Sequence, residues 1–591
     1  MTSFFASPAM RSLRARFVRL YGEAGAGACL ERLAMLVGRY GVGAARQVRA
    51  EKWSQRDALL IAYGDMIRKP GEAPLATLTR FLDSRLAGVF SAVHILPFFP
   101  SSSDGGFAVQ HYRQVSPELG GWAHIRDLAR RFDLMVDLVL NHVSSQSGWF
   151  ADFQMGIAPA REYFIEVPPD ADLSAVVRPR TTPLLTPVQT RAGVKHVWTT
   201  FSADQVDLNF ARPDVLFEML DLLLFYASMG ARLIRLDAVA FLWKEIGTSC
   251  LHRPQTHELV RLFREFLKIA SPDTLLLTET NVPQAENLAY FGRGDEAHLV
   301  YQFPLPPLVL DAFCGGSAAP LTRWAQALKL PPAGCTYLNF TASHDGIGLR
   351  PAEGLLDTAA MERLQARVLR NGGRVSYRRN PDGSQSPYEW NITWRDALRG
   401  PASEPAALHL ARLLGSQTLP LALQGIPAVY FHALAARPND HAAFRETGQA
   451  RWLNRGSWME ADLFGKLEDA GSLTSQLFRE LCRRLRLRRR LPAFHPLAAQ
   501  RVLDLDPRCF AVVRSGPNGN KSLLALHNVS ARPLRLATDR LPPPWNSGRA
   551  FKNALAPDRP LPARAWHLAP YEAAWVVGAD ACPPAEPGPA Y

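Results

Sequence analysis

The chain has 591 residues, of which 47% are hydrophobic and 20% charged, the composition of a globular protein with material for a large core. It contains no run of eighteen apolar residues that could span a membrane, and its N-terminus lacks the pattern of a signal peptide. Its seven scattered cysteines, none in a C-x-x-C pair, argue against a disulfide framework or a zinc site. We therefore expect a cytoplasmic protein with no membrane attachment and no metal centre.

The net charge of +13 is most concentrated in RELCRRLRLRRRLPAFHP, residues 479–496. Such a patch is typical either of a surface for nucleic acid or membrane, or of an arginine-rich amphipathic helix. The helix would bury Leu481, Leu485 and Leu487 on its apolar side. We favour the helix, and predict no nucleic-acid partner, because no interleaved aromatic residues and no nucleic-acid motif accompany the charge.

The elements follow a repeated pattern of an apolar strand and a helical spacer, which indicates βα units around a parallel sheet. The first fifty residues have a helical pattern. Eight candidate strands follow in chain order, at residues 57–65, 89–99, 133–141, 231–238, 274–280, 298–303, 335–345 and 427–434. Eight such strands predict an α/β protein with a (β/α)8 TIM barrel.

Two of the intervals between strands are too long for simple connections. Residues 143–210 predict a small inserted B subdomain, and residues 346–424 a second loop insertion after strand seven. After residue 493, short alternating runs predict a C-terminal antiparallel β domain. The predicted division is an N-terminal helical extension over 1–52, a catalytic barrel over 53–142 and 211–492, the B subdomain over 143–210, and the β domain over 493–581.

Polar side chains follow the predicted strands at their carboxyl ends, where a TIM barrel carries its chemistry. They are Asp104, Asp137, Asn141, His142, Arg235, Asp237, Glu279, His344 and Asp345. Any one of them alone has a ready structural explanation as a hydrogen-bonding residue. Their shared placement at one barrel mouth indicates a catalytic site.

Two carboxylates that face the anomeric carbon of a sugar are the arrangement of glycosidic-bond chemistry. In a retaining mechanism, one attacks as the nucleophile and the other protonates the leaving oxygen. Arg235, on the same strand face as Asp237, is placed to lower the pKa of that carboxylate and keep it ionised. Glu279 follows an apolar run, where burial would raise its pKa and suit a general acid/base. We predict Asp237 as the nucleophile and Glu279 as the acid/base.

Five segments occur in the order that is found in the α-amylase family, glycoside hydrolase family 13, and resemble its signature regions. They are DLVLNH, QVDLN, RLIRLDAVA, LLLTETN and FTASHD. The resemblance extends over about residues 55 to 490. It implies that Asp345 is a third carboxylate that binds the glucose hydroxyls, and that His142, His344 and Arg235 surround the glucose. Asn141 resembles a calcium ligand of some amylases, but we favour a hydrogen-bonding role for it.

Longer segments, among them HILPFFPSSSDGGFAVQHYRQVSPELG and SHDGIGLRP, resemble the sucrose-phosphorylase subfamily. This resemblance implies that Asp104 lies at the closed end of the glucose pocket and pairs with Arg455. It also implies that Phe107 stacks on an apolar sugar face. A pocket closed in this way would disfavour long polysaccharides. The implied reaction needs inorganic phosphate as co-substrate and no cofactor, and the implied state is a monomer or a homodimer.

The chain also departs from sucrose phosphorylases. Phe241 and Trp243 replace a segment that usually contains tyrosine, and Asn281 stands where a histidine is usual. These departures resemble the branch that acts on glucosylglycerate or sucrose 6-phosphate, although Gln284 replaces a histidine expected there. For the phosphate, the second insertion offers Arg374, Arg378, Arg379 and Tyr388.

The resemblance therefore implies a retaining α-glucoside phosphorylase that produces α-D-glucose 1-phosphate, with 2-O-α-D-glucosylglycerate as the first expected substrate. Sucrose 6-phosphate, sucrose and glucosylglycerol are the next candidates. A hydrolase or transglucosidase is a further alternative, in which water or a sugar replaces phosphate. A non-catalytic sugar-binding relative would lack one of the three carboxylates, and all three are present here.

Overall fold

A closed barrel of eight parallel strands forms the centre of the computed structural model, which describes residues 8–40, 49–516, 522–547 and 549–584. Its strands are β1 (Leu59–Ala62), β3 (Ala92–Ile95), β4 (Asp133–Val139), β9 (Ala231–Asp237), β10 (Leu275–Thr278), β11 (Leu299–Tyr301), β12 (Thr336–Asn339) and β16 (Ile426–Tyr430). Each overlaps one predicted strand, and β1 closes the barrel by pairing with β16. The predicted TIM barrel is confirmed.

The barrel strands are buried along nearly their whole length because helices cover them outside and side chains fill the barrel inside. All four residues of β1 and all four of β10 are buried. The long helices of this part of the chain are α3 (Pro74–Arg85), α4 (Trp122–Arg131), α6 (Pro213–Ser228), α7 (Pro254–Ala270), α9 (Leu305–Gly315), α13 (Ala406–Ala422) and α17 (Leu473–Arg489). The arginine-rich segment forms α17, and Leu481, Leu485 and Leu487 are buried as predicted.

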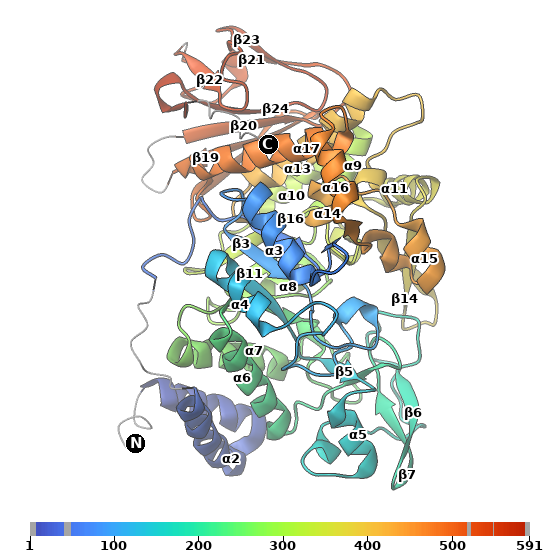
Figure 1. Cartoon of the computed structure of the whole chain (residues 1–591). Coiled ribbons are helices and arrows are strands. Elements are labelled where there is room, and N and C mark those ends of the chain that lie inside the picture. Colours follow the sequence, from blue (N-terminus) through green and yellow to red (C-terminus); the bar gives the residue numbers. More distant parts are fainter. Residues whose placement is uncertain (1–7, 41–48, 517–521, 548, 585–591) are drawn as a thin grey trace.

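The first insertion, residues 143–210, lies beside the carboxyl ends of the barrel strands. Its elements are β5 (His142–Ser144), which pairs with β8 (Gln205–Asp207), α5 (Gly148–Met155), and the hairpin of β6 (Leu185–Thr190) and β7 (Gly193–Trp198). Figure 1 shows α5, β6 and β7 together at the lower right. A small apolar cluster that includes Trp198 and Cys250 packs this insertion against the loop after β9.

The second insertion, residues 346–424, contributes a three-stranded antiparallel sheet in the order β13 (Ile347–Gly348), β15 (Gln385–Asn391) and β14 (Arg374–Arg379). Helices α11 (Thr358–Arg370) and α12 (Trp394–Ala397) flank the β14–β15 hairpin in the chain. Between β16 and α17 lie α14 (Phe431–Leu434), α15 (His441–Thr447), η6 (Ala450–Asn454) and α16 (Glu460–Glu468). The hairpin pairs through Arg374 and Asn391 at one end and Arg379 and Gln385 at the other.

The C-terminal part is antiparallel, as predicted. A five-stranded sheet contains β18 (Ala499–Asp506), β19 (Cys509–Ser515), β20 (Ser522–Asn528), β24 (Ala573–Gly578) and β22 (Phe551–Asn553). A two-stranded sheet pairs β21 (Leu534–Ala537) with β23 (Ala565–Leu568). Figure 1 shows these strands at the end of the molecule opposite the N-terminal helix. The last ten residues, CPPAEPGPAY, lie mostly outside the described residues.

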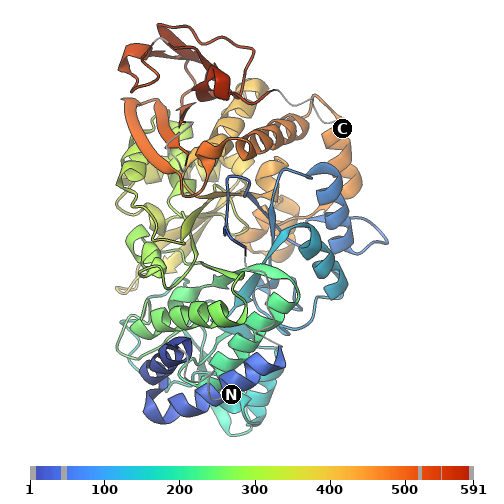
Figure 2. The ribbon, with the colours of Figure 1, turned by 90° about the vertical axis from the view of Figure 1, so that its left-hand side faces the viewer.

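The N-terminal helix α2 (Pro8–Arg39) bends at Gly22, whose φ is 73°. It packs against α6 and α7, as Figures 1 and 2 show from two sides. Arg16 contacts Glu265 at 2.5 Å and Arg32 contacts Asp214 at 2.6 Å across this interface. Residues 1–7 and 41–48 of the predicted helical extension lie outside the described residues. Among the described residues, no helix has both the length and the apolar character needed to cross a membrane.

Candidate active site

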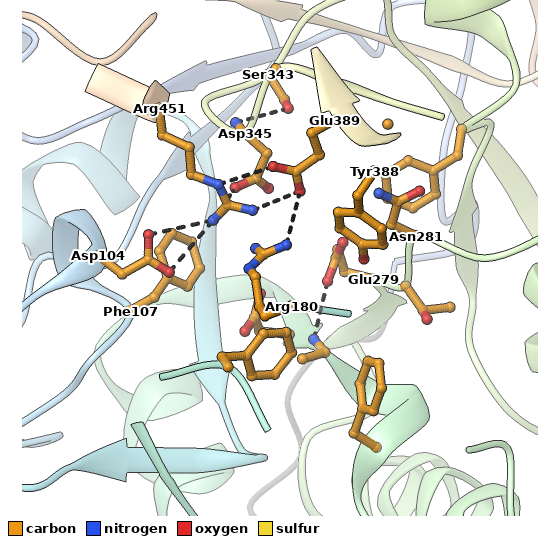
Figure 3. A pocket seen from close by; sticks show the side chains of 18 of the residues that line it. Asp104, Phe107, Arg180, Glu279, Asn281, Ser343, Asp345, Tyr388, Glu389 and Arg451 are labelled. Atoms are coloured by element: carbon orange, nitrogen blue, oxygen red, sulfur yellow. Dashed lines mark hydrogen bonds and ion pairs between the residues drawn. The ribbon is translucent and has the colours of Figure 1, made fainter. Parts of the chain in front are cut away.

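A pocket of about 740 Å³ opens at the carboxyl ends of the barrel strands, between the two insertions (Figure 3). The sequence predicts nine site residues, namely three catalytic carboxylates and six residues that bind the glucose. Six of these nine line the pocket: Asp104, Phe107, His142, Asp237, Glu279 and Asp345. The other three, Arg235, His344 and Arg455, lie directly behind this lining, and each is 3% exposed. The structure thus brings all nine predicted residues together.

The carboxylate at the end of β9 is paired in the way that its burial requires. Arg235 Nη1 lies 2.8 Å from Asp237 Oδ1, and Nη2 of the same guanidinium lies 3.7 Å from Glu279 Oε2. Arg235 also contacts Asp137, which His94 contacts at 2.7 Å from the other side. Glu279 accepts a hydrogen bond of 3.1 Å from the backbone N–H of Ala238. One buried arginine therefore holds both predicted catalytic carboxylates.

Burial raises the pKa of Glu279, as predicted from its apolar strand. Burial also raises the pKa of Asp237 well above its ordinary value. Arg235 opposes this effect, but the neighbouring carboxylates of Glu279 and Asp137 reinforce it. Arg235 therefore lowers the pKa of Asp237, as predicted, but burial and the neighbouring carboxylates outweigh this effect. Two such close carboxyl groups favour sharing one proton, and the shorter contact with Arg235 favours the charge on Asp237.

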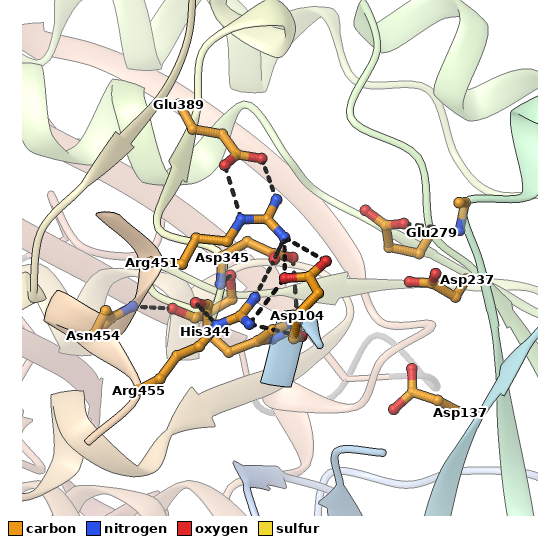
Figure 4. A network of polar contacts seen from close by, with 12 residues as sticks. Asp104, Asp137, Asp237, Glu279, His344, Asp345, Glu389, Arg451, Asn454 and Arg455 are labelled. Carbon is orange, nitrogen blue, oxygen red and sulfur yellow. Dashed lines mark hydrogen bonds and ion pairs between the residues drawn. The ribbon is translucent and has the colours of Figure 1, made fainter. Parts of the chain in front are cut away.

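Asp104 and Arg455 form the ion pair that the resemblance implies (Figure 4), and we call this part of the pocket the closed end. Arg455 Nη1 lies 3.1 Å from Asp104 Oδ1, and its Nη2 lies 3.3 Å from Asp345 Oδ1. Asp104 has a φ of 52°, and Gly105 follows with a φ of 59°. A Cβ on Gly105 would lie 2.7 Å from Arg455 Nη1, so this tight turn needs glycine. Burial by itself would raise the pKa of Asp104, but the arginines beside this carboxylate hold its pKa below the ordinary value.

Aromatic rings lie next to the closed end of the pocket. The rings of Phe107 and His344 are stacked, with centroids 5.0 Å apart and planes within 4°. Burial lowers the pKa of His344 to about 3, so its ring is neutral at pH 7. Burial lowers the pKa of His142 as well, and its Nε2 lies 3.1 Å from the carbonyl oxygen of Phe107. Both rings are therefore neutral at pH 7, and His142 lines the pocket whereas His344 packs against Phe107 behind the lining.

Three charged residues that sequence reasoning did not place in the site also line the pocket: Arg180, Glu389 and Arg451. Arg180 comes from the first insertion and Glu389 from β15, so their meeting depends on how two distant insertions fold. Arg451 lies one helical turn before Arg455 in RWLNR, and this spacing was the only signal for it. Its Nη1 lies 2.9 Å from Asp345 Oδ1.

The candidates for phosphate binding in the second insertion divide into two groups. Tyr388 lines the pocket, whereas Arg374, Arg378 and Arg379 do not. Arg378 instead contacts Glu353 at 3.2 Å, and the guanidinium of Arg374 lies over the ring of Phe444. Asn281 also lines the pocket, at the position where sucrose phosphorylases carry histidine.

Asn141 takes part in a buried polar cluster beneath the first insertion. Lys244 Nζ lies 2.7 Å from Asn141 Oδ1 and 2.6 Å from Asp207 Oδ2, and it also donates to the carbonyl oxygen of Phe241. Asn141 donates to Asp207 in turn. The hydrogen-bonding role favoured for Asn141 is confirmed. Within the described residues, no group of three or more His, Cys, Asp or Glu side chains is arranged to hold a metal ion.

Residues 87–330 match the model of the catalytic domain of α-amylases. Over 560 residues, 94% of this chain and 97% of the relative, the chain is 47% identical to a glucosylglycerate phosphorylase of Allomeiothermus silvanus. It is 42% identical to a glucosylglycerate phosphorylase of Escherichia coli, over 82% of this chain and 87% of that one.

Among solved structures, the sucrose 6F-phosphate phosphorylase of Thermoanaerobacter thermosaccharolyticum superposes with a TM-score of 0.70 at 25% identity, over 80% of this chain and 94% of that one. The high identity to the curated relatives extends over nearly their whole length. Together with the barrel and its carboxylates, it places this protein in a known enzyme family. The chain belongs to the α-amylase family and, within it, to the group that contains these phosphorylases.

Proposed function

We propose that this chain is a retaining glycoside phosphorylase that converts 2-O-α-D-glucosylglycerate and phosphate to α-D-glucose 1-phosphate and D-glycerate. The observation that carries the proposal is the 47% identity to a glucosylglycerate phosphorylase over 97% of that protein. Asp237, Glu279 and Asp345 line one pocket in this chain, which supports a catalytic role.

In the first step, the carboxylate of Asp237 attacks the anomeric carbon of the bound glucosyl unit. Glu279 gives its proton to the departing oxygen of glycerate, and its raised pKa suits this task. Arg235 holds both groups and neutralises the charge on Asp237. The step leaves a covalent glucosyl ester on Asp237 and an ionised Glu279.

In the second step, phosphate enters the space that glycerate leaves. The ionised Glu279 accepts a proton from phosphate, and a phosphate oxygen displaces Asp237 from the anomeric carbon. Two displacements on opposite faces retain the α-configuration. Every bond in this sequence is made and broken by carboxylates and phosphate, so we propose that no metal or organic cofactor takes part.

The glucosyl unit binds at the closed end, and the acceptor binds on the side of the two insertions. Asp104 and Asp345, held by Arg455, accept hydrogen bonds from the glucose hydroxyls, and Phe107 stacks on the sugar. His142 and His344 fix the rest of the ring. Because the Asp104–Arg455 pair leaves no passage beyond one glucose, the enzyme removes single glucosyl units and disfavours polysaccharides.

Arg180 is the first candidate to hold phosphate and the carboxylate of glycerate. Its guanidinium lies 5.1 Å from the ring of Tyr388 and 5.8 Å from that of Phe201, both in the pocket wall. Its one acidic partner within 4 Å among the described residues is Glu389, at 3.7 Å. This weak pairing leaves donor groups for an anion that enters the pocket.

The function is tested by phosphate release from α-D-glucose 1-phosphate with D-glycerate, fructose 6-phosphate, fructose, glycerol or no acceptor. Of these acceptors, we expect only D-glycerate to give fast phosphate release. Fast release with fructose 6-phosphate instead would make the enzyme a sucrose 6-phosphate phosphorylase. Slow release that no acceptor changes would contradict phosphorolysis and favour a hydrolase. We propose a cytoplasmic monomer or homodimer, since the cytoplasm supplies the phosphate that the reaction consumes.

A further inference from the structure

A continuous chain of ionic contacts crosses the pocket from the acceptor side to the closed end (Figures 3 and 4). It begins at Arg180, passes through Glu389 and Arg451, and ends at the carboxylates of Asp345 and Asp104. These residues come from separate elements: the first insertion, the β14–β15 hairpin, η6 and the loops after β12 and β3. Strand pairing already joins two of these parts, because Glu389 on β15 pairs with Gly348 on β13, three residues after Asp345. The ionic contacts add Arg180, Arg451 and Asp104 to this connection.

Arg451 is the centre of this chain. Its Nη2 lies 2.7 Å from Glu389 Oε1 and its Nε lies 3.2 Å from Oε2, so it grips the hairpin carboxylate with two donors. Its Nη1 lies 2.9 Å from Asp345 and 3.4 Å from Asp104. The planar guanidinium binds Glu389 with two donors and Asp345 and Asp104 with a third, and an ammonium group does not offer this bidentate geometry.

The position of the buried Glu389 carboxylate depends on its contact with Arg451. Its side chain is 4% exposed, and its second cation, Arg180, lies farther away at 3.7 Å. A buried carboxylate that loses its closest cation is strongly destabilised. Tyr388 precedes Glu389 on the same strand and lines the pocket, so a displacement of Glu389 would move Tyr388 as well.

Arg455 differs from Arg451 in what it reaches. It contacts Asp104, Asp345 and the carbonyl oxygen of His344, all at the closed end, and its side chain is 1% exposed. Among the described residues, Arg455 makes no hydrogen bond or ion pair with the hairpin. Of these two arginines, only Arg451 contacts both the hairpin and the carboxylates at the closed end.

We propose that Arg451 is a positioning residue, which holds the β14–β15 hairpin and its acceptor-facing residues Tyr388 and Glu389 against the carboxylates of the glucose pocket. The proposal rests on the proposed function, because it takes Asp104 and Asp345 as the glucose side and the hairpin as the acceptor side. Arg451 therefore affects the two half-reactions indirectly, through its contacts with Glu389 and Asp345.

The first test measures the hairpin itself, without reference to activity. Trypsin cleaves after arginine, and the hairpin carries Arg378 and the exposed Arg379. In Arg451→Gln and Glu389→Gln, we expect cleavage after these two residues to be about five to ten times faster than in the unchanged protein. The matched control is Arg445→Gln, which removes an exposed arginine of α15 and should leave the cleavage rate unchanged.

The second test separates positioning from mere stability. Kinetics with 4-nitrophenyl α-D-glucoside report the glucose side, and the KM for phosphate reports the acceptor side. Arg451→Gln should raise the KM for phosphate about tenfold. It should also move the acidic limb of the pH profile for the aryl glucoside to higher pH, because Asp345 loses its closest cation. Glu389→Gln should raise the KM for phosphate to a similar extent, but it should leave the acidic limb of the aryl glucoside profile unchanged.

The outcomes decide the proposal. If both variants loosen the hairpin and the double variant is no worse for phosphate than Arg451→Gln alone, the two residues act as one unit. If Arg451→Gln is cleaved at the rate of the unchanged protein, or if the effects of the two variants multiply, the proposal is overturned. Failure of the proposed function would appear differently, as nitrophenol release by the unchanged protein that phosphate does not alter. The cleavage rates and the acidic limb would still decide the role of Arg451.

Discussion

Lys244 holds the first insertion to the barrel through charge, and its replacement by methionine tests how much that charge contributes. The side chain of Lys244 is 4% exposed and that of Asp207 is fully buried. Lys244→Met keeps the length of the side chain and removes the ammonium group. Asp207 then retains Thr200 and Asn141 as hydrogen-bond donors but loses its cation.

The expected cost follows from this geometry. Removal of one member of a buried ion pair destabilises proteins by about 3–5 kcal/mol, because the other charge stays buried. For a chain of 591 residues, an unfolding entropy of about 2.1 cal/mol/K per residue converts this to a fall in Tm of roughly 2–4 °C. If the insertion opens by itself, the same cost appears as faster local proteolysis of residues 143–210.

The assay combines thermal unfolding with limited proteolysis of Lys244→Met, Asp207→Asn and the double variant. We expect the double variant to recover much of the loss of Lys244→Met, since no uncompensated charge remains buried. Lys195→Met, at an exposed ion pair of the same insertion, is the control and should change the Tm by less than about 1 °C. An unchanged Tm and unchanged proteolysis for Lys244→Met would refute this reasoning.

Four further predictions concern the reaction. Asp237→Ala should lower turnover by about 10⁴-fold or more with no fall in Tm, since it removes the nucleophile and relieves repulsion with Glu279; near-normal turnover would contradict the assignment. Glu279→Gln should lower the rate with glucosylglycerate about 10³-fold but the rate with an activated aryl glucoside far less, because only the former needs a proton. In the unchanged protein, kcat/KM for glucosylglycerate should fall as pH rises through the raised pKa of Glu279, because the acid must carry its proton. The pH profile for the aryl glucoside should not show this fall. Identical profiles for the two substrates would argue against Glu279 as the acid. Arg180→Gln should raise the KM for phosphate with little change in nitrophenol release, and equal losses in both would assign Arg180 another role.

The barrel could be predicted because its signal is local. A strand buried on both faces is an unbroken apolar run, and LLIA and LLLT show this directly. Parallel strands also bring their carboxyl ends to one face, so polar residues at those ends must converge. Asp237 and Glu279 could therefore be placed side by side before their contact with Arg235 was known.

The remaining features depend on contacts between distant segments. The link from Arg180 to Glu389 exists only because two insertions meet above the barrel. The pKa of Asp237 depends on burial and on Asp137 and Glu279, whereas the sequence reveals only Arg235 nearby. On α17, the leucines indicated the apolar face, but not that Arg488 is also fully buried and donates to backbone carbonyls such as that of Leu421.

The docking of α2 has a consequence for how the protein is made. Its ion partners lie far ahead in the chain: Asp214 and Asp221 each follow their arginine by 182 residues. At a synthesis rate of about 5–20 residues per second, α2 leaves the ribosome roughly 10 to 40 s before the surface that it will cover. Its buried leucines and Phe17 stay uncovered during that interval. During synthesis, α2 is thus exposed to chaperones and to aggregation until the segment that contains α6 and α7 has emerged.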